Sequence, residues 1–383
     1  MVSSNRREFI KNCSAVCAGV TTAGLFSRRS YTAETSEGNR ITYRKLGSTG
    51  FKVSEVGFGA MNTRDAELIN AAIDAGINYI DTAHGYMNGI NEQIVGQVLK
   101  SKREKVFLTT KVSRRNPDDI PEMINISLKR LQTDHIDLLL LHGPSQKDQI
   151  LNDDFMKKFD DARKQGKTRF VGFSTHSNHT ECVDMAVKSK FWEAVCVGYN
   201  YKSPPELTES IKKAREAGIA IIAMKTQLRG SGYSDKSTEK VTDQQAALKW
   251  VLQNPYVDTT IPGMTSFEHL AEDLAVMGMK MTFDDNRTIQ RYSEDLKGRY
   301  CCGVSGCTGC TDTCPYGVQV NEINRCLGYV YGYGDIRLAR ENYADIVRTS
   351  RIDICSDCDE CVVKCVNGLN LTENIKRAAQ LFA

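Results

Sequence analysis

Short apolar runs alternate with longer amphipathic stretches from about residue 50 to residue 263. Each run is nearly continuous in Val, Ile, Leu and Ala, which is typical of parallel strands buried on both faces. The stretches between them repeat apolar residues at i, i+3, i+4 and i+7, which predicts helices with one buried face. The eight runs are, in order, VSEVGFGA, INYIDTA, KVFLTTKV, HIDLLLLHG, TRFVGFST, EAVCVGYNY, IAIIAMKT and VDTTIPG.

This alternation predicts an α/β fold, a closed (β/α)8 barrel of the TIM type, over residues 41–284. Gly76 and Gly218 stand where two of the helices should end. An open, doubly wound sheet is the alternative, but no Gly-x-Gly-x-x-Gly sequence follows the first run, where a dinucleotide fold needs it. Residues 41–54 precede that run and are interpreted as a hairpin that plugs the floor of the barrel.

Four polar residues follow apolar runs at the predicted carboxyl ends of strands, where barrel enzymes place their reactive groups. They are Asp81, Tyr86, Lys111 and His142. A phenol has a pKa near 10, so it needs a neighbouring cation to exchange a proton readily at neutral pH. Lys111 can supply that cation, Asp81 can hold it, and His142 can bind a substrate oxygen. This combination suits interconversion of a carbonyl and an alcohol.

The motifs DTAHGY, TTKV and LLLLHG that carry these residues resemble those of the aldo-keto reductases. The resemblance spans about residues 41 to 280 and implies that Tyr86 is the general acid/base, tuned by Lys111 and Asp81. It also implies a bound dinucleotide, NADP or NAD, held by a set of residues spread over three loops. These are Ser174, Thr175, Tyr199, Gly263, Thr265, Ser266 and Glu272.

Two departures from the family pattern bear on the dinucleotide. Gly263 and His269 replace a Lys and an Arg that commonly grip a 2′-phosphate, which leaves NAD and NADP both open. For Tyr199, stacking on the nicotinamide and ordinary packing in the barrel are alternative interpretations. His84, His176 and His179 show no metal-ligand spacing and are expected to be solvated loop histidines. Cys182 and Cys196 lie among apolar residues and are expected to be core thiols.

After about Asp284 the alternation stops and ten of the fourteen cysteines follow, in residues 285–383. The spacing of Cys355-x2-Cys358-x2-Cys361-x3-Cys365 is that of a ferredoxin run, and Cys307-x2-Cys310-x3-Cys314 repeats its last three positions. We therefore expect a mostly helical, ferredoxin-like unit with one or two 4Fe-4S clusters. In two-cluster ferredoxins the fourth Cys of a run ligates the other cluster.

If the fourth cysteine of each run ligates the cluster of the other run, two ligand sets are predicted. One comprises Cys314, Cys355, Cys358 and Cys361, and the other Cys302, Cys307, Cys310 and Cys365. Cys302 is preferred to Cys301 for the last corner, because Val304 occupies the regular position. Zinc knuckles and disulfides are the competing interpretations. A subset of aldo-keto reductases with such a module after the barrel is similar.

The N-terminal sequence NRREFIK matches the twin-arginine export motif except at its first position, and a weakly apolar run follows it. Residues 1–33 are therefore interpreted as a signal peptide, and no segment is expected to span a membrane stably. The twin-arginine route exports folded proteins, so clusters assembled in the cytosol would travel inside the protein. We expect a periplasmic or other extracytoplasmic location, with a cytoplasmic protein bearing a vestigial signal as the alternative.

Charge and composition point to a small-molecule substrate. The formal charge of +3 arises from 50 basic and 47 acidic residues without a basic block, which argues against a nucleic-acid partner. The expected function is an exported oxidoreductase acting on a carbonyl or alcohol, a sugar being one candidate, with the clusters passing electrons to an external partner. The alternative is a non-catalytic barrel that serves as a scaffold for an electron-transfer unit.

Overall fold

The computed structural model describes residues 41–383, with a few positions left out. Those outside the description are 114, 229–241, 306, 308, 345, 347, 359–360 and 383. The predicted signal at residues 1–33 also lies outside the described residues.

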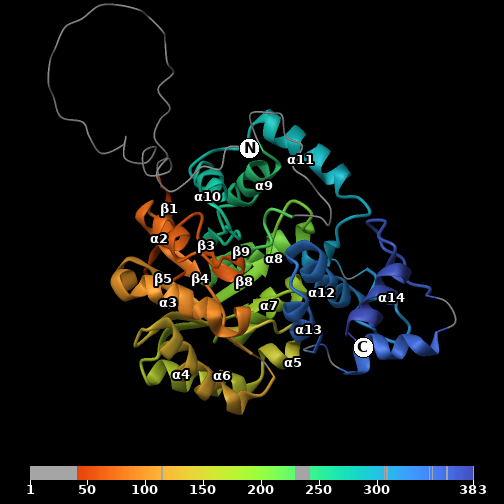
Figure 1. Ribbon diagram of the computed structural model, residues 1–383, viewed down its shortest axis with the longest axis horizontal. Coiled ribbons are helices and arrows are strands. Elements are labelled where there is room, and N and C mark those ends of the chain that lie inside the picture. Colours follow the sequence, from red (N-terminus) through yellow and green to blue (C-terminus); the bar gives the residue numbers. More distant parts are fainter. Residues whose placement is uncertain are drawn as a thin grey trace, which may run out of the picture.

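Eight parallel strands form one sheet in which each strand pairs with the next along the chain (Figure 1). They are β3 (Phe58–Gly59), β4 (Tyr79–Asp81), β5 (Phe107–Ser113), β6 (Ile136–His142), β7 (Thr168–Thr175), β8 (Ala194–Gly198), β9 (Ala220–Met224) and β10 (Thr259–Thr260). Bridges from Val56 to Thr260 and from Gly59 to Gly263 join the two outer strands. The sheet is therefore closed, which confirms the barrel and contradicts the open-sheet alternative.

Helices surround the barrel on the outside. They are α2 (Ala66–Asp74), α3 (Ile90–Lys102), α4 (Ile120–Leu131), α5 (Lys147–Ile150), α6 (Asp153–Lys164), α7 (His179–Ser189), α8 (Pro205–Glu216), α9 (Asp243–Leu252) and α10 (Phe267–Leu274). Gly76 and Gly218 follow α2 and α8 with φ of +106° and +88°. This left-handed backbone is the usual way to end a helix, so both predicted ends are confirmed.

Side chains alternate between the two faces of each strand. In β6, Leu138 and Leu140 fill the barrel interior, while Leu139 and Leu141 pack against the helices. The hairpin of β1 (Tyr43–Lys45) and β2 (Lys52–Ser54) lies at the amino-terminal end, as predicted. Its Leu46 and Val53 join the interior cluster, so the floor is closed.

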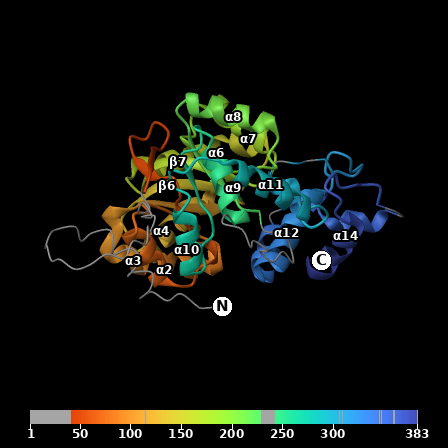
Figure 2. The same ribbon diagram turned by 90° about the horizontal axis from the view of Figure 1, so that it is seen from above.

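The chain after the barrel forms a smaller helical unit beside it (Figure 2). Its elements are α11 (Phe283–Asp295), η5 (Cys302–Ser305), α12 (Val320–Tyr333), α13 (Ile336–Ala344), η7 (Ile352–Asp357) and α14 (Leu371–Phe382). Helix α12 is central and packs against η5, α13 and α14. Helix α11 instead packs against α9, so the expected boundary at residue 284 falls at the second residue of a helix that covers the barrel. Within the described ranges no helix is both long and apolar enough to cross a bilayer.

Candidate active site and cysteine groups

Asp81, Lys111 and Tyr86 converge at the carboxyl ends of β4 and β5. The ammonium of Lys111 donates a hydrogen bond to the Asp81 carboxylate, another to the carbonyl of Thr82 at 2.8 Å, and a third to the Tyr86 hydroxyl at 3.3 Å. Lys111 and Asp81 are 2% and 3% exposed, so this ion pair is shielded from water. The pairing of the strands explains why the three side chains meet: β4 and β5 are parallel neighbours and end at the same edge of the sheet.

His142 completes this group from the end of β6. Its ring lies edge-on to the Tyr86 ring, with 5.8 Å between the centroids. A carbonyl oxygen placed between the phenol and the imidazole would find a hydrogen-bond donor on each side. The structure thus brings together all four residues proposed from the sequence.

Burial governs the proton affinity of Tyr86. It raises the pKa of the phenol to about 12, although the Lys111 cation acts in the opposite direction. Burial opposes the charge on Lys111 as well, but the Asp81 carboxylate outweighs it and raises the pKa of that ammonium. The expected net lowering of the phenol pKa is therefore wrong for the free protein. Tyr86 is a protonated phenol at neutral pH, which is the form that can give a proton to a carbonyl oxygen.

The loop after Tyr86 has an unusual backbone that fixes the position of the phenol. Met87, Asn88 and Gly89 have φ of 50°, 59° and 83°, three left-handed residues in succession. A side chain at Gly89 would overlap the guanidinium of Arg130, since an added Cβ would lie 2.1 Å from its Cζ. Arg130 in turn donates to the carboxylate of the fully buried Glu92 at 3.3 Å.

Ser174 and Thr175 at the end of β7 face opposite sides of the sheet. The Ser174 hydroxyl is buried without a hydrogen-bond partner in the described part of the chain, so it can serve a bound ligand. The hydroxyl of Thr175 donates to the carbonyl of Ser177 at 2.8 Å and lies beneath α7, near Cys182. In this arrangement the hydroxyl of Ser174, and not that of Thr175, faces the barrel interior.

Tyr199 is turned away from the catalytic group for the same reason. Its ring packs on Trp250 in the layer between the barrel and the helices, with centroids 5.3 Å apart. Its hydroxyl is hydrogen-bonded to Thr208 and Asn254. These contacts favour the interpretation of Tyr199 as ordinary barrel packing.

The proposed dinucleotide residues after β10 lie around the start of α10. Ser266 caps the helix, its hydroxyl accepting from the backbone of His269 at 3.2 Å, and the Thr265 hydroxyl contacts the His269 ring at 3.2 Å. The Glu272 carboxylate accepts from the Thr242 hydroxyl. Gly263 pairs with Gly59 of β3 through a parallel bridge. The segment that begins at Gly263 therefore starts at the edge of the sheet.

Nine of the ten cysteines after residue 300 fall into two groups, and Cys326 lies outside both. In the first, the Cys355 thiol interacts electrostatically with Cys358, Cys314 and Cys361. These are the four residues that the ferredoxin spacing assigns to one cluster. Cys355 lies in η7 and Cys314 precedes α12, so residues 41 positions apart in sequence meet at one place.

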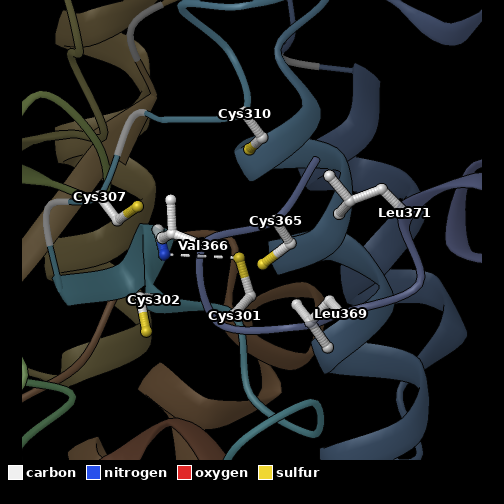
Figure 3. Close-up of a pocket in the computed structure, with 9 residues that line it drawn as sticks. Cys301, Cys302, Cys307, Cys310, Cys365, Val366, Leu369 and Leu371 are labelled. Atoms are coloured by element: carbon white, nitrogen blue, oxygen red, sulfur yellow. Dashed lines mark hydrogen bonds between the residues drawn. The ribbon is translucent and has the colours of Figure 1, made fainter. Parts of the chain in front are cut away.

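The second group lines a pocket on the C-terminal unit (Figure 3). The cysteines around it are Cys301, Cys302, Cys307, Cys310 and Cys365. In Figure 3 the sulfur of Cys301 lies near that of Cys365, and the Cys302 thiol interacts electrostatically with Cys307 and Cys365. The Cys301 thiol interacts electrostatically with Cys310, Cys302 and Cys365, and it accepts a hydrogen bond from the backbone of Gly303 at 3.4 Å.

The cysteines of the described residues are not bonded to one another. All twelve cysteines in the described part of the chain are free thiols, so none of them forms a disulfide with another. No three His, Cys, Asp or Glu side chains there are arranged to hold a single metal ion.

The profile of the Aldo/keto reductase family matches residues 46–239. The chain belongs to this family. It is 27% identical over 300 residues to the oxidoreductase YqkF of Bacillus subtilis. The aligned region covers 66% of this chain and 96% of that protein. Methylglyoxal reductase DkgB of Escherichia coli O157:H7 is 27% identical over 248 residues, 61% of this chain and 90% of that one. The holo form of aldo-keto reductase AKR11C1 from Bacillus halodurans has a TM-score of 0.55 at 27% identity, over 66% of this chain and 96% of that one.

Membership in the aldo/keto reductases, with the catalytic group complete, makes this chain an NAD(P)-dependent oxidoreductase that acts on carbonyls. The alternative of a non-catalytic scaffold is therefore set aside. The family match ends at residue 239, before the cysteine-rich unit begins.

Three histidines near the catalytic end of this aldo/keto reductase are more buried than expected. His179 is 1% exposed, while His84 and His176 are half-buried, so the expectation of solvated loop histidines is wrong. The His176 ring lies 5.9 Å from that of His142, one step farther along the face that carries Ser174. Alternation along β7 could have indicated this position.

Proposed function

We propose that the protein is an exported iron–sulfur aldo/keto reductase that interconverts a carbonyl and an alcohol on a small polar molecule. A sugar is one candidate for that molecule. NAD or NADP is the hydride carrier, and one or two 4Fe-4S clusters relay electrons between the dinucleotide and an external partner. The observation that carries the reductase chemistry is the buried contact of Lys111 with both Asp81 and Tyr86.

The catalytic group handles the proton and the oxygen of the substrate. When bound, the nicotinamide supplies the hydride for the carbonyl carbon or accepts it from the alcohol. Tyr86 gives its proton to the carbonyl oxygen as the C–H bond forms. Lys111 stabilises the phenolate that remains, and Asp81 keeps Lys111 charged and in place. His142 donates a hydrogen bond to the same oxygen and orients the carbonyl.

Two features of the barrel mouth support a dinucleotide. The buried Ser174 hydroxyl lacks a partner among the described residues and stands one residue from the end of β7, where it can bind the carboxamide. The start of α10 presents Thr265 and a capped helix end, which suits a phosphate. Gly263 and His269 bring no permanent cation for a 2′-phosphate, so both NAD and NADP stay within the proposal.

Two groups of cysteines, each with members from both ferredoxin-like runs, support the proposal of iron–sulfur clusters. Cys314, Cys355, Cys358 and Cys361 would hold one cluster. Around the pocket of Figure 3, Cys307, Cys310 and Cys365 would hold the second cluster together with Cys302 or its neighbour Cys301. When bound, iron–sulfur clusters supply one-electron storage and transfer. Soft thiolates crowded together in this number suit iron and sulfide.

The proposed location follows from the sequence of residues 1–33 and from the cysteine groups on the same chain. Outside the cytoplasm no pool of NAD(P)H renews a reduced cofactor, so the dinucleotide would be exported bound. An external redox partner would then exchange electrons with it through the clusters. Fractionation of cells that express the full chain tests this. Recovery in the cytoplasmic fraction, with no dependence on the twin-arginine translocase, would contradict export.

One preparation tests the chemistry as a whole. The full chain is purified without air, and iron, acid-labile sulfide and released nucleotide are measured on the same sample. We expect about four irons and four sulfides per chain for each cluster, and about one nucleotide. Zinc in place of iron, or a colourless protein without sulfide, would overturn the cluster proposal. Failure of chemically reduced clusters to reduce the bound dinucleotide would overturn the electron relay.

A further inference from the structure

Helix α12 of the cysteine-rich unit lies against the catalytic end of the barrel. Glu322, Arg325 and Tyr329 are spaced i, i+3 and i+7 along it, so they share one helix face. Their exposures are 6%, 6% and 4%, although all three are polar or charged. Burial of so much polarity on one face needs a reason beyond packing, because apolar residues would cover the barrel at lower cost.

This face interacts with residues at the ends of β4, β7 and β9. The ammonium of Lys225, directly after β9, lies 5.2 Å from the centre of the Tyr329 ring. Tyr86 interacts electrostatically with both Tyr329 and Lys225, and His176 with Arg325. Since Lys225 directly follows β9, its contact with the Tyr329 ring places that ring at the end of the barrel that carries the catalytic group.

Arg325 fixes the Tyr329 hydroxyl. It donates to that oxygen at 3.0 Å, to Asn342 on α13 at 2.8 Å, and twice to the Glu322 carboxylate at 3.1 and 2.7 Å. A hydroxyl that accepts from a guanidinium becomes a stronger donor itself, since hydrogen bonds in series polarise one another. Tyr329 is thus a phenol held in one orientation by a charged, braced partner.

The residues around Tyr86 match an oxygen-rich substrate better than an apolar one. His142, His176, Lys225 and Tyr329 all bring polar groups to this region, and burial with the nearby Arg325 and Lys225 cations keeps the pKa of His176 well below its usual range. A neutral His176 can both donate and accept a hydrogen bond. An apolar aldehyde would desolvate these groups without replacing their hydrogen bonds.

We propose that Tyr329 is a specificity-determining residue of this enzyme, supplied by the cysteine-rich unit. It contacts the substrate across from Tyr86 and favours carbonyl compounds that bear a hydroxyl on the carbon next to the reacting one. The inference rests on the proposed function, and it narrows the substrate class from small polar carbonyls to α-hydroxy carbonyls.

The test compares glyceraldehyde, which has the neighbouring hydroxyl, with propanal, which lacks it. Both are assayed on the full-length holoenzyme and on its Tyr329→Phe variant, which keeps the ring over Lys225 and removes only the hydroxyl. We expect kcat/KM for glyceraldehyde to fall about tenfold, the loss of one substrate hydrogen bond, while the value for propanal changes less than about twofold. Tyr331→Phe is the matched control, because Tyr331 lies on the same helix but is 47% exposed.

A purely structural role of Tyr329 would give a different result. Loss of the hydroxyl would then disturb Arg325 and the packing of α12, and kcat/KM would fall equally for both aldehydes. An equal fall, or an unchanged ratio of the two values, overturns the inference. Failure of the proposed function is recognised separately, since the wild-type enzyme would then reduce neither aldehyde with NADH or NADPH, and the inference would fall with it.

Discussion

The ammonium of Lys111 contacts the hydroxyl of Tyr86 at 3.3 Å and passes 4.9 Å from the centre of its ring. The cation thus reaches the phenol oxygen while its own charge is balanced by Asp81. This arrangement makes Tyr86 the residue whose loss should affect the chemical step most.

Tyr86→Phe should abolish proton transfer but leave nucleotide binding intact. The ring is kept, so its packing beside Lys111 persists and only the proton is lost. We expect kcat to fall by about a hundredfold to ten-thousandfold, the usual contribution of a general acid. The dissociation constant of the nucleotide, measured by fluorescence titration, should change less than about twofold. Tyr316→Phe, at a site 51% exposed, serves as the control, and equal activity of both variants would contradict the assignment.

The pH dependence of carbonyl reduction should follow the raised pKa of Tyr86, about 12. Reduction requires the protonated phenol, which is present below that pKa and is lost as the pH rises through it. We therefore expect kcat for reduction to show no descending limb due to Tyr86 below about pH 10. A pH profile of kcat with saturating nucleotide checks this. A descending limb between pH 7 and 9 that disappears in the residual activity of Tyr86→Phe would contradict it.

Much of the fold was predictable because strands of a closed parallel sheet are buried on both faces. Their near-continuous apolar runs mark all eight, and the polar residues after four runs mark the catalytic end. Thr175 and Tyr199 are harder to place, because distance along the chain does not show which face of the sheet a residue takes. Ser174 and His176 share the face toward the catalytic group, while Thr175 faces the helices.

The contribution of α12 could not be predicted from local pattern. Arg325 and Tyr329 lie more than 180 residues from His142 in the sequence, and nothing nearby signals that they approach the barrel. Their burial results from docking of one unit on another, which single-sequence periodicity does not encode. A polar face on a helix predicts exposure to solvent unless a second element that packs against it is known.

The ion pair of Lys249 and Asp285 should be important for the attachment of α11 to the barrel. The two nitrogen–oxygen distances are 3.0 and 3.2 Å, and Asp285 is fully buried. Asp285→Asn leaves a buried ammonium without its counter-charge, so we expect a loss of about 3–5 kcal/mol in the free energy of unfolding. Urea denaturation measures it. Asp161→Asn, in the exposed pair with Lys157, should cost less than about 1 kcal/mol.

Acid should weaken the same attachment. Burial alone would raise the pKa of Asp285, but hydrogen bonds from Thr282 and Lys249 outweigh it and lower the pKa. A carboxyl whose folded-state pKa is depressed contributes stability above its unfolded value, and this stability is lost as the pH falls through the folded one. The difference in stability between wild type and Asp285→Asn should therefore be constant near neutrality and shrink below about pH 4. A difference that grew on acidification would contradict the assignment.

Replacement of single cysteines should reveal which thiol completes the second set. Cys301 interacts with Cys310 and Cys365 and its sulfur accepts a backbone hydrogen bond, whereas Cys302 interacts with Cys307 and Cys365 and has no such bond among the described residues. A cluster with three ligands is readily lost, so Cys301→Ala should bind about four fewer irons per chain than the wild type. Cys302→Ala should retain the wild-type iron content. Anaerobic purification followed by iron and sulfide analysis measures both, with Cys326→Ala as the control for a buried thiol outside either set. The reverse outcome, with iron lost only from Cys302→Ala, would mean that the loop before η5 rearranges when the cluster binds and that the longer sequence spacing decides the ligand.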